Sequence, residues 1–122
     1  MTILNTLKNS ILEELVGAEN EYKLGRYKNA LILYSKAIFS MCDLLIAIKN
    51  LRLPKDHNER FRVLERYLPA VYKIVDKVFK KYTDTYLKPT DKESCEGMKN
   101  AIKEINSIER FDKEIKTFIE KI

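Results

Sequence analysis

The stretch YKNALILYSKAIFSMCDLLIAIKNL, residues 27–51, predicts the centre of the fold. Apolar residues recur in it at intervals of three and four, the period of one face of an α-helix. That face carries Ala30, Tyr34, Ala37, Ile38, Met41, Leu44, Leu45 and Ile48, while Leu31, Leu33, Phe39 and Ile46 lie elsewhere around the axis. A helix that is apolar on nearly every side is either central in a bundle or covered by another subunit. Lys36 and Asp43 favour a buried core helix over a membrane span, so we expect no membrane association.

Helical periodicity continues on both sides of this segment and predicts four further helices. They run from about Ile3 to Leu24, from His57 to Leu68, from Pro69 to Tyr82, and from about Glu93 to Ile122. Pro69 either breaks or kinks the chain between the middle two, and the sequence leaves both alternatives open. The last helix ends in a heptad-like stripe that needs a partner surface; it comprises Ile108, Phe111, Ile115, Phe118 and Ile122.

Local signals mark the ends of these helices. The candidates are Thr2 as an N-cap, Gly25 as a left-handed stop, and two capping boxes, Asp56 with Glu59 and Thr90 with Glu93. Pro54 ends the central helix, because the residue before a proline is pushed out of the helical conformation.

Composition supports one all-helical domain. The chain has 122 residues, 45% of them hydrophobic and 34% charged, with only three Gly and three Pro, and this excludes collagen-like, disordered and disulfide-scaffold classes. One His and two Cys give a metal site almost nothing to draw on, so we expect neither a metal nor a cofactor. Cys42 and Cys95 are expected to be reduced and buried. The N-terminal residues show no basic region followed by an apolar one, which predicts a cytoplasmic protein.

Positive charge is concentrated in one part of the chain. The formal net charge is +5, and the window from Arg60 to Lys88 holds eight basic residues against three acidic ones. Six of the eight are candidate nucleic-acid or nucleotide ligands: Arg62, Arg66, Lys73, Lys77, Lys80 and Lys81. These side chains could neutralise phosphates, while Tyr72, Tyr82 and Tyr86 could stack on unpaired bases. The alternative is a solvated lysine-rich face with tyrosines that belong to the core.

Two further sets of polar residues are candidates. His57 is the only imidazole, so any histidine acid–base chemistry must use it, although a histidine directly after a cap can simply occupy a helix start. Lys36, Ser40 and Asp43 form a polar stripe on the central helix, which either faces water or lines a polar cleft. Phosphate-loop, G-x-S-x-G and HExxH motifs do not occur, so no enzyme class is signalled.

The segment Gly25-Arg26-Tyr27-Lys28-Asn29-Ala30 resembles the turn and second helix of one tetratricopeptide repeat. A broader pattern resembles the HEPN domain, a family of small prokaryotic helical bundles, over about residues 11–120. It comprises Ala18, Glu21, Leu24-Gly25-Arg26-Tyr27, Ala30-Leu31, Lys36-Ala37-Ile38, Asp43-Leu44-Leu45, Asp56-His57 and Leu64, followed by a tyrosine-bearing helix and a long amphipathic one.

The HEPN resemblance implies an up-and-down bundle of about five helices, related to the C-terminal domain of kanamycin nucleotidyltransferase. It also implies a homodimer that often acts beside a minimal nucleotidyltransferase as toxin and antitoxin. Many members are ribonucleases with an Arg followed after four to six residues by a His. Arg52 and His57 have that spacing, but Leu53 follows the Arg and Pro54 interrupts the helix. The sequence therefore predicts a non-catalytic member that binds RNA, a nucleotide or a partner protein. The alternatives are a ribonuclease using Arg52 and His57, and a helical adaptor with a tetratricopeptide-like hairpin.

Overall fold

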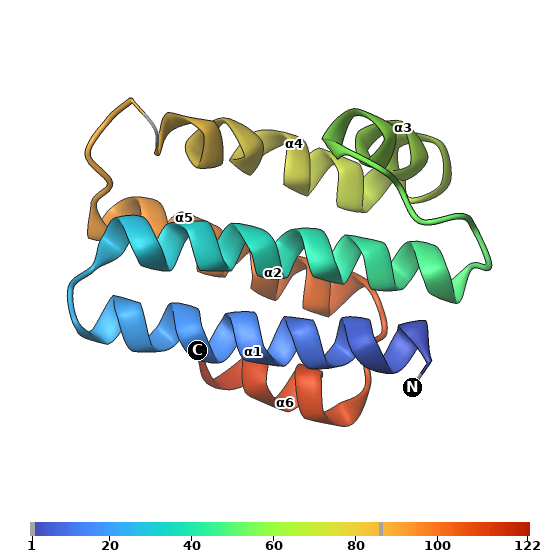
Figure 1. Cartoon of the computed structure of the whole chain (residues 1–122), viewed down its shortest axis with the longest axis horizontal. Coiled ribbons are helices and arrows are strands. Elements are labelled where there is room, and N and C mark those ends of the chain that lie inside the picture. Colours follow the sequence, from blue (N-terminus) through green and yellow to red (C-terminus); the bar gives the residue numbers. More distant parts are fainter. Residues whose placement is uncertain (1, 86) are drawn as a thin grey trace.

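The computed structural model describes residues 2–85 and 87–122, and within them the chain is all-helical, as the sequence predicts (Figure 1). The helices are α1 (Ile3–Lys23), α2 (Tyr27–Ile48), α3 (His57–Tyr67), α4 (Pro69–Asp84), α5 (Lys92–Ile108) and α6 (Lys113–Lys121). Apart from the short α3, successive helices run back and forth along the long axis of the molecule, which gives an up-and-down bundle.

Helix α2 is the central element. It lies between α1 on one side and α3 and α4 on the other, with α5 behind it (Figure 1). Twelve of its 22 residues are buried, including Tyr34, Met41 and Ile46. Its apolar surface is therefore covered within one chain, and the first alternative for this helix is confirmed. The homodimer stays a prediction, but α2 no longer argues for it.

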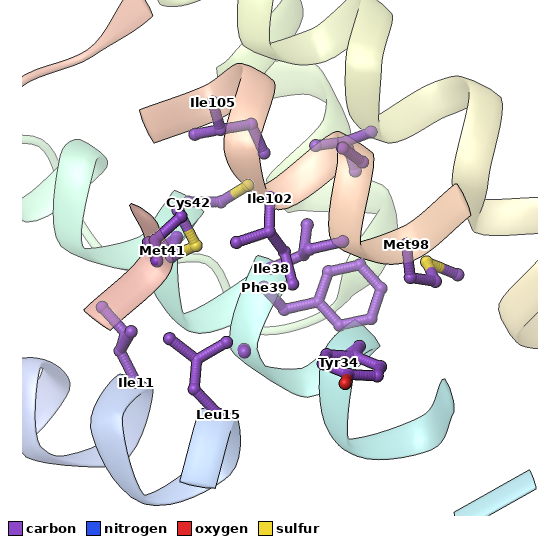
Figure 2. Close-up of a cluster of buried hydrophobic side chains, with 14 of the residues drawn as sticks. Ile11, Leu15, Tyr34, Ile38, Phe39, Met41, Cys42, Met98, Ile102 and Ile105 are labelled. Atoms are coloured by element: carbon purple, nitrogen blue, oxygen red, sulfur yellow. The ribbon is translucent and has the colours of Figure 1, made fainter. Parts of the chain in front are cut away.

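The core forms where α1, α2 and α5 meet. Figure 2 shows Ile11 and Leu15 of α1 pointing toward side chains of α2, with Met98, Ile102 and Ile105 of α5 closing the cluster from the other side. All five of these side chains are fully buried. Helix α2 is long and apolar enough to cross a membrane by length and composition, and 61% of its most apolar window is buried inside the bundle. A core helix meets the same test.

The expected single C-terminal helix is wrong. The chain leaves helical conformation at Glu109 (φ −124°, ψ 155°), and α6 begins after Asp112, whose carboxylate accepts a hydrogen bond from the Ile115 amide at 3.3 Å. The predicted stripe is divided accordingly, because Ile108 is 45% exposed while Phe111 and Ile115 are buried where α6 folds back onto α1. The apolar period of three and four continues across this break, so the period alone does not reveal it. Asp112 as an N-cap was the signal in the sequence that a new helix begins there.

Most other helix ends agree with the sequence. Thr2 accepts from the Asn5 amide, and Gly25 has φ 76°. Asp56 accepts from the Glu59 amide, but the Glu59 carboxylate binds Arg52 instead of completing the box. Two ends need correction. The N-cap of α5 is Asp91, which accepts from the Ser94 amide, rather than Thr90. Helix α2 ends at Ile48 instead of Leu51, since Asn50 takes a left-handed conformation with φ 59°.

Leu68 separates α3 from α4. Its backbone (φ −138°, ψ 59°) is outside the helical region, and Pro69 is the first residue of α4, so the chain is broken here rather than kinked. Leu68 turns inward and is 6% exposed, whereas Tyr67 is 43% exposed. The break sets the orientation of the two helices that carry the basic residues.

Candidate functional site

An ion pair between α2 and α3 anchors the basic part of the chain to the core. The Arg60 guanidinium donates to both carboxylate oxygens of Asp43, at 2.8 and 3.0 Å. The two side chains are only 12% and 18% exposed. Because the two hydrogen bonds are parallel and the pair is largely shielded from water, it fixes the orientation of α3 relative to α2.

His57 joins this ion pair. The third nitrogen of Arg60 lies 2.7 Å from His57 Nδ1, and because a guanidinium can only donate, Nδ1 accepts and the proton of the neutral imidazole is on Nε2. The His57 ring packs against Phe39 at 4.4 Å and Phe79 at 5.3 Å between ring centroids. Burial, and secondly the charge of Arg60, lower the pKa of His57 below its usual 6.5. The imidazole is thus a neutral packing group in an aromatic cluster as well as the residue after the cap.

The structure does not pair Arg52 with His57. The Arg52 side chain is 74% exposed and binds the Glu59 carboxylate at 3.1 Å. The guanidinium that reaches His57 belongs to Arg60, three residues further along α3. Arg60 was not predicted as the partner of His57, although the i, i+3 spacing of the two residues on one helix places them on neighbouring positions.

The polar stripe of α2 is also divided among different neighbours. Lys36 is exposed, the Ser40 hydroxyl donates to Glu14 of α1 at 2.7 Å, and Asp43 faces α3 through Arg60. Ser40 and Asp43 therefore fasten α2 to two different helices, and the three residues do not line one cleft.

All six predicted basic ligands are exposed. Arg62 and Arg66 lie one turn apart, opposite the buried Leu64 of α3. Lys73, Lys77 and Lys80, spaced four and three, form one stripe of α4 opposite its buried face.

Lys81 departs from that stripe, because a Cβ atom built on Gly97 of α5 would lie 2.4 Å from the Lys81 amino group. Lys81 is therefore turned toward α5.

These cations are available to a ligand. None of the six forms an ion pair with a carboxylate in the part of the chain that the structure describes. On the same two helices only Glu65 and Asp76 are carboxylates without an ion pair, since Glu59 binds Arg52 and Asp84 binds Lys88. The outer surface of α3 and α4 is thus strongly positive. We call Arg62, Arg66, Lys73, Lys77 and Lys80 the basic face.

The aromatic residues near the basic face differ from the expectation. Tyr82 packs at 5.5 Å from Phe39 in the aromatic cluster, whereas Tyr72 is half-buried and meets Phe61 edge to face at 6.5 Å between ring centroids. Tyr86 lies outside the described residues. The exposed ring is Tyr67, with the Arg66 guanidinium 5.3 Å above it. The signal in the sequence for this exposed ring is its position just before Leu68 and Pro69, where the helix breaks.

A second buried charge cluster lies at the other end of the bundle, where α1, α2 and α5 meet. Lys99 is 8% exposed; its amino group is 3.3 Å from the Glu19 carboxylate and 3.7 Å from the centre of the Tyr22 ring. The Tyr34 hydroxyl donates to Glu19, and that of Tyr22 donates to Glu96. Nothing in the lysine-rich sequence distinguished Lys99 as a buried residue. Its partners Glu19 and Tyr22 lie on α1, so the cluster holds two helices of the bundle together.

Comparison with known proteins adds no further assignment. No family model, no curated protein and no solved structure matches this chain. The HEPN resemblance therefore stays a prediction. Within residues 2–85 and 87–122, no group of three His, Cys, Asp or Glu side chains is placed to hold a metal ion.

Proposed function

We propose that this chain is a non-catalytic, HEPN-like binding module that binds single-stranded nucleic acid, RNA in the first instance, on the basic face of α3 and α4. The observation that carries the proposal is that these cations are exposed and free of carboxylate partners. Phosphates bind such cations by releasing condensed counterions, and this favours binding of any nucleic-acid strand.

The geometry around the basic face supports a single strand as the ligand. Tyr67 offers an exposed ring beside Arg66, and a base can stack on such a ring or on a guanidinium plane. The Asp43–Arg60 ion pair holds α3 against the core, so the face is presented by a fixed element. A fixed surface loses less conformational entropy on binding than a mobile loop does.

The test is binding of a fluorescent single-stranded RNA, followed by anisotropy over a range of salt concentrations. The variant carries Lys73→Glu, Lys77→Glu and Lys80→Glu. The matched control carries Lys28→Glu, Lys103→Glu and Lys116→Glu, three exposed lysines on α2, α5 and α6. Both variants change the net charge equally, so a difference between them reports position rather than overall charge.

We expect the α4 variant to lose most of the affinity and the control to keep most of it. Each phosphate contact contributes about −0.7 to the slope of log K against log salt for single strands, so removal of three contacts should reduce the slope by about 2. Equal weakening of both variants, or an affinity indifferent to salt, would contradict the proposal. Binding of a protein partner that survives the α4 reversal would favour the adaptor with the α1–α2 hairpin.

The nucleotidyltransferase partner and the ribonuclease alternative stay predictions of the HEPN resemblance. Cleavage that vanishes in His57→Ala would favour the ribonuclease. Because Arg60, and not Arg52, lies beside His57, the same assay should include Arg60→Ala and Arg52→Ala.

A further inference from the structure

Two carboxylates lie among the cations of α3 and α4. Glu65 and Asp76 are exposed, and neither forms an ion pair in the part of the chain that the structure describes. Lys73 lies three residues before Asp76 and Lys80 four residues after it, spacings at which opposite charges on a helix can pair. Because no such pair forms, the carboxylate oxygens are open to a hydrogen-bond donor of a ligand.

Both carboxylates lie close to Tyr72. The Tyr72 and Phe61 rings meet edge to face, 6.5 Å apart between centroids, which brings one side of α4 against one side of α3. Glu65 follows Phe61 by one turn of α3. Asp76 likewise follows Tyr72 by one turn of α4, so both carboxylates belong to the sides that meet. We call Glu65, Tyr72 and Asp76 the Tyr72 cluster.

Electrostatics agree with this placement. The negative charge of Asp76, and secondly that of Glu65, raises the pKa of Tyr72. One carboxylate comes from each helix, and the tyrosine between them is half-buried. The Tyr72 cluster therefore offers two acceptors and part of a ring within a surface whose other charged groups are donors.

This chemistry suits a nucleobase and not a phosphate. A carboxylate repels the phosphates that lysine and arginine bind, so Glu65 and Asp76 weaken the contact with the backbone of a strand. Carboxylates do accept hydrogen bonds from the amino group of cytosine in nucleic-acid recognition. The half-buried ring of Tyr72 gives such a base a surface to lie against.

We propose that the Tyr72 cluster reads one base of a single strand bound on the basic face, and that it selects bases with an exocyclic amino group, cytosine in the first instance, over uracil. This inference rests on the proposed function, because the cations hold the strand. The amino group of cytosine has two N–H donors, one for each carboxylate. Uracil has a carbonyl oxygen at that position, and its ring N–H lies between two carbonyl oxygens, which repel a carboxylate. The two rings have the same size, so the carboxylates and not stacking make the difference.

The test compares fluorescent oligocytidylate and oligouridylate of equal length, by anisotropy with the full chain. The wild type should bind oligocytidylate about fivefold more tightly, at the low end for a direct base contact because the site is open to water. The variant carries Glu65→Gln and Asp76→Asn. The matched control carries Glu104→Gln and Glu120→Gln, which remove two exposed carboxylates of α5 and α6.

Affinity and preference should change in opposite directions in the Glu65→Gln, Asp76→Asn variant. Loss of two negative charges strengthens the binding of both strands, because the repulsion of phosphates falls. The preference for oligocytidylate should shrink to less than about twofold, since an amide donates as well as accepts and no longer rejects uracil. The control should keep the preference of the wild type. A wild type that binds both strands equally, or a variant that keeps the preference, would overturn the inference.

Nuclear magnetic resonance tests the position of the base directly. In the complex with oligocytidylate, nuclear Overhauser contacts should join the cytosine ring protons to the ring protons of Tyr72. Contacts to Tyr67 without any to Tyr72 would overturn the placement. Salt-dependent binding without a preference between the strands would overturn this inference alone. Binding that is weakened equally by the α4 lysine reversal and its lysine control would overturn the proposed function, and the inference with it.

Discussion

Replacement of Lys99 by alanine should destabilise the fold more than loss of any other lysine in the chain. The Lys99 and Glu19 side chains are 10% and 16% exposed, so the ion pair at 3.3 Å is poorly screened by water. Removing one partner of a buried pair leaves the other charge uncompensated and costs about 3 kcal/mol. The contact with the Tyr22 ring at 3.7 Å, which the variant also loses, acts in the same direction.

The assay is thermal and urea unfolding. For a chain of this length the entropy of unfolding is about 0.26 kcal/mol per kelvin, so 3 kcal/mol corresponds to a fall in Tm of about 12 °C. Lys103→Ala, on an exposed position one turn further along α5, is the control and should change the free energy of unfolding by less than about 0.5 kcal/mol.

A double variant separates the ion pair from the packing of the lysine stem. Glu19→Gln combined with Lys99→Met removes both charges. This double variant should be more stable than the summed losses of the single variants Glu19→Gln and Lys99→Met predict, with a coupling free energy of about 1 kcal/mol or more. A loss below about 1 kcal/mol in Lys99→Ala, or single losses that add without coupling, would refute the claim that this buried pair holds α5 to α1.

Three further predictions follow from single residues. The pKa of His57 is lower in the folded protein than the usual 6.5, so the unfolded chain binds a proton at this imidazole at a higher pH than the folded chain does. The stabilisation is therefore present above about pH 6.5 and is lost as the pH falls below that value toward the folded pKa. Urea unfolding at about pH 7.5 and pH 5 should show a larger fall in the free energy of unfolding for the wild type than for His57→Gln. Burial raises the pKa of Cys42 to about 12 and that of Cys95 to about 11, so Ellman's reagent should leave both thiols of the native protein unmodified and react with both in denaturant. Gly25 has φ 76°, and Gly25→Ala should therefore cost about 1 kcal/mol and lower Tm by about 4 °C, whereas an unchanged Tm would show that the turn tolerates a side chain.

The sequence was informative where local pattern decides the structure. The apolar residues on all sides of residues 27–51 predicted a helix that is either central or covered by another subunit. Side-chain caps such as Thr2 and Asp56 marked helix starts, because a cap depends on neighbours a few residues away. The sequence left open whether the basic residues are exposed, and the structure shows them exposed, opposite the buried residues of α3 and α4. The break before α6 was missed, since Ile108 and Phe111 continue the same period across it.

The sequence was uninformative where long-range packing chooses the partner. Arg60 binds Asp43 across 17 residues, and Lys99 binds Glu19 across 80, so neither pairing leaves a local mark in the sequence. Tyr82 is of a residue type that can stack on bases, but the orientation of α4 places its ring in the aromatic cluster against Phe39. Which cations and rings remain exposed is decided by helix orientation, and that depends on contacts between helices.

We propose that the basic face of α3 and α4 binds single-stranded RNA. The most direct measurement is the salt dependence of RNA affinity for two variants of equal net charge, the Lys73, Lys77 and Lys80 reversal on α4 and the Lys28, Lys103 and Lys116 reversal elsewhere. We expect a slope reduced by about 2 for the α4 variant and a slope close to that of the wild type for the control. Equal slopes for the two variants would contradict it.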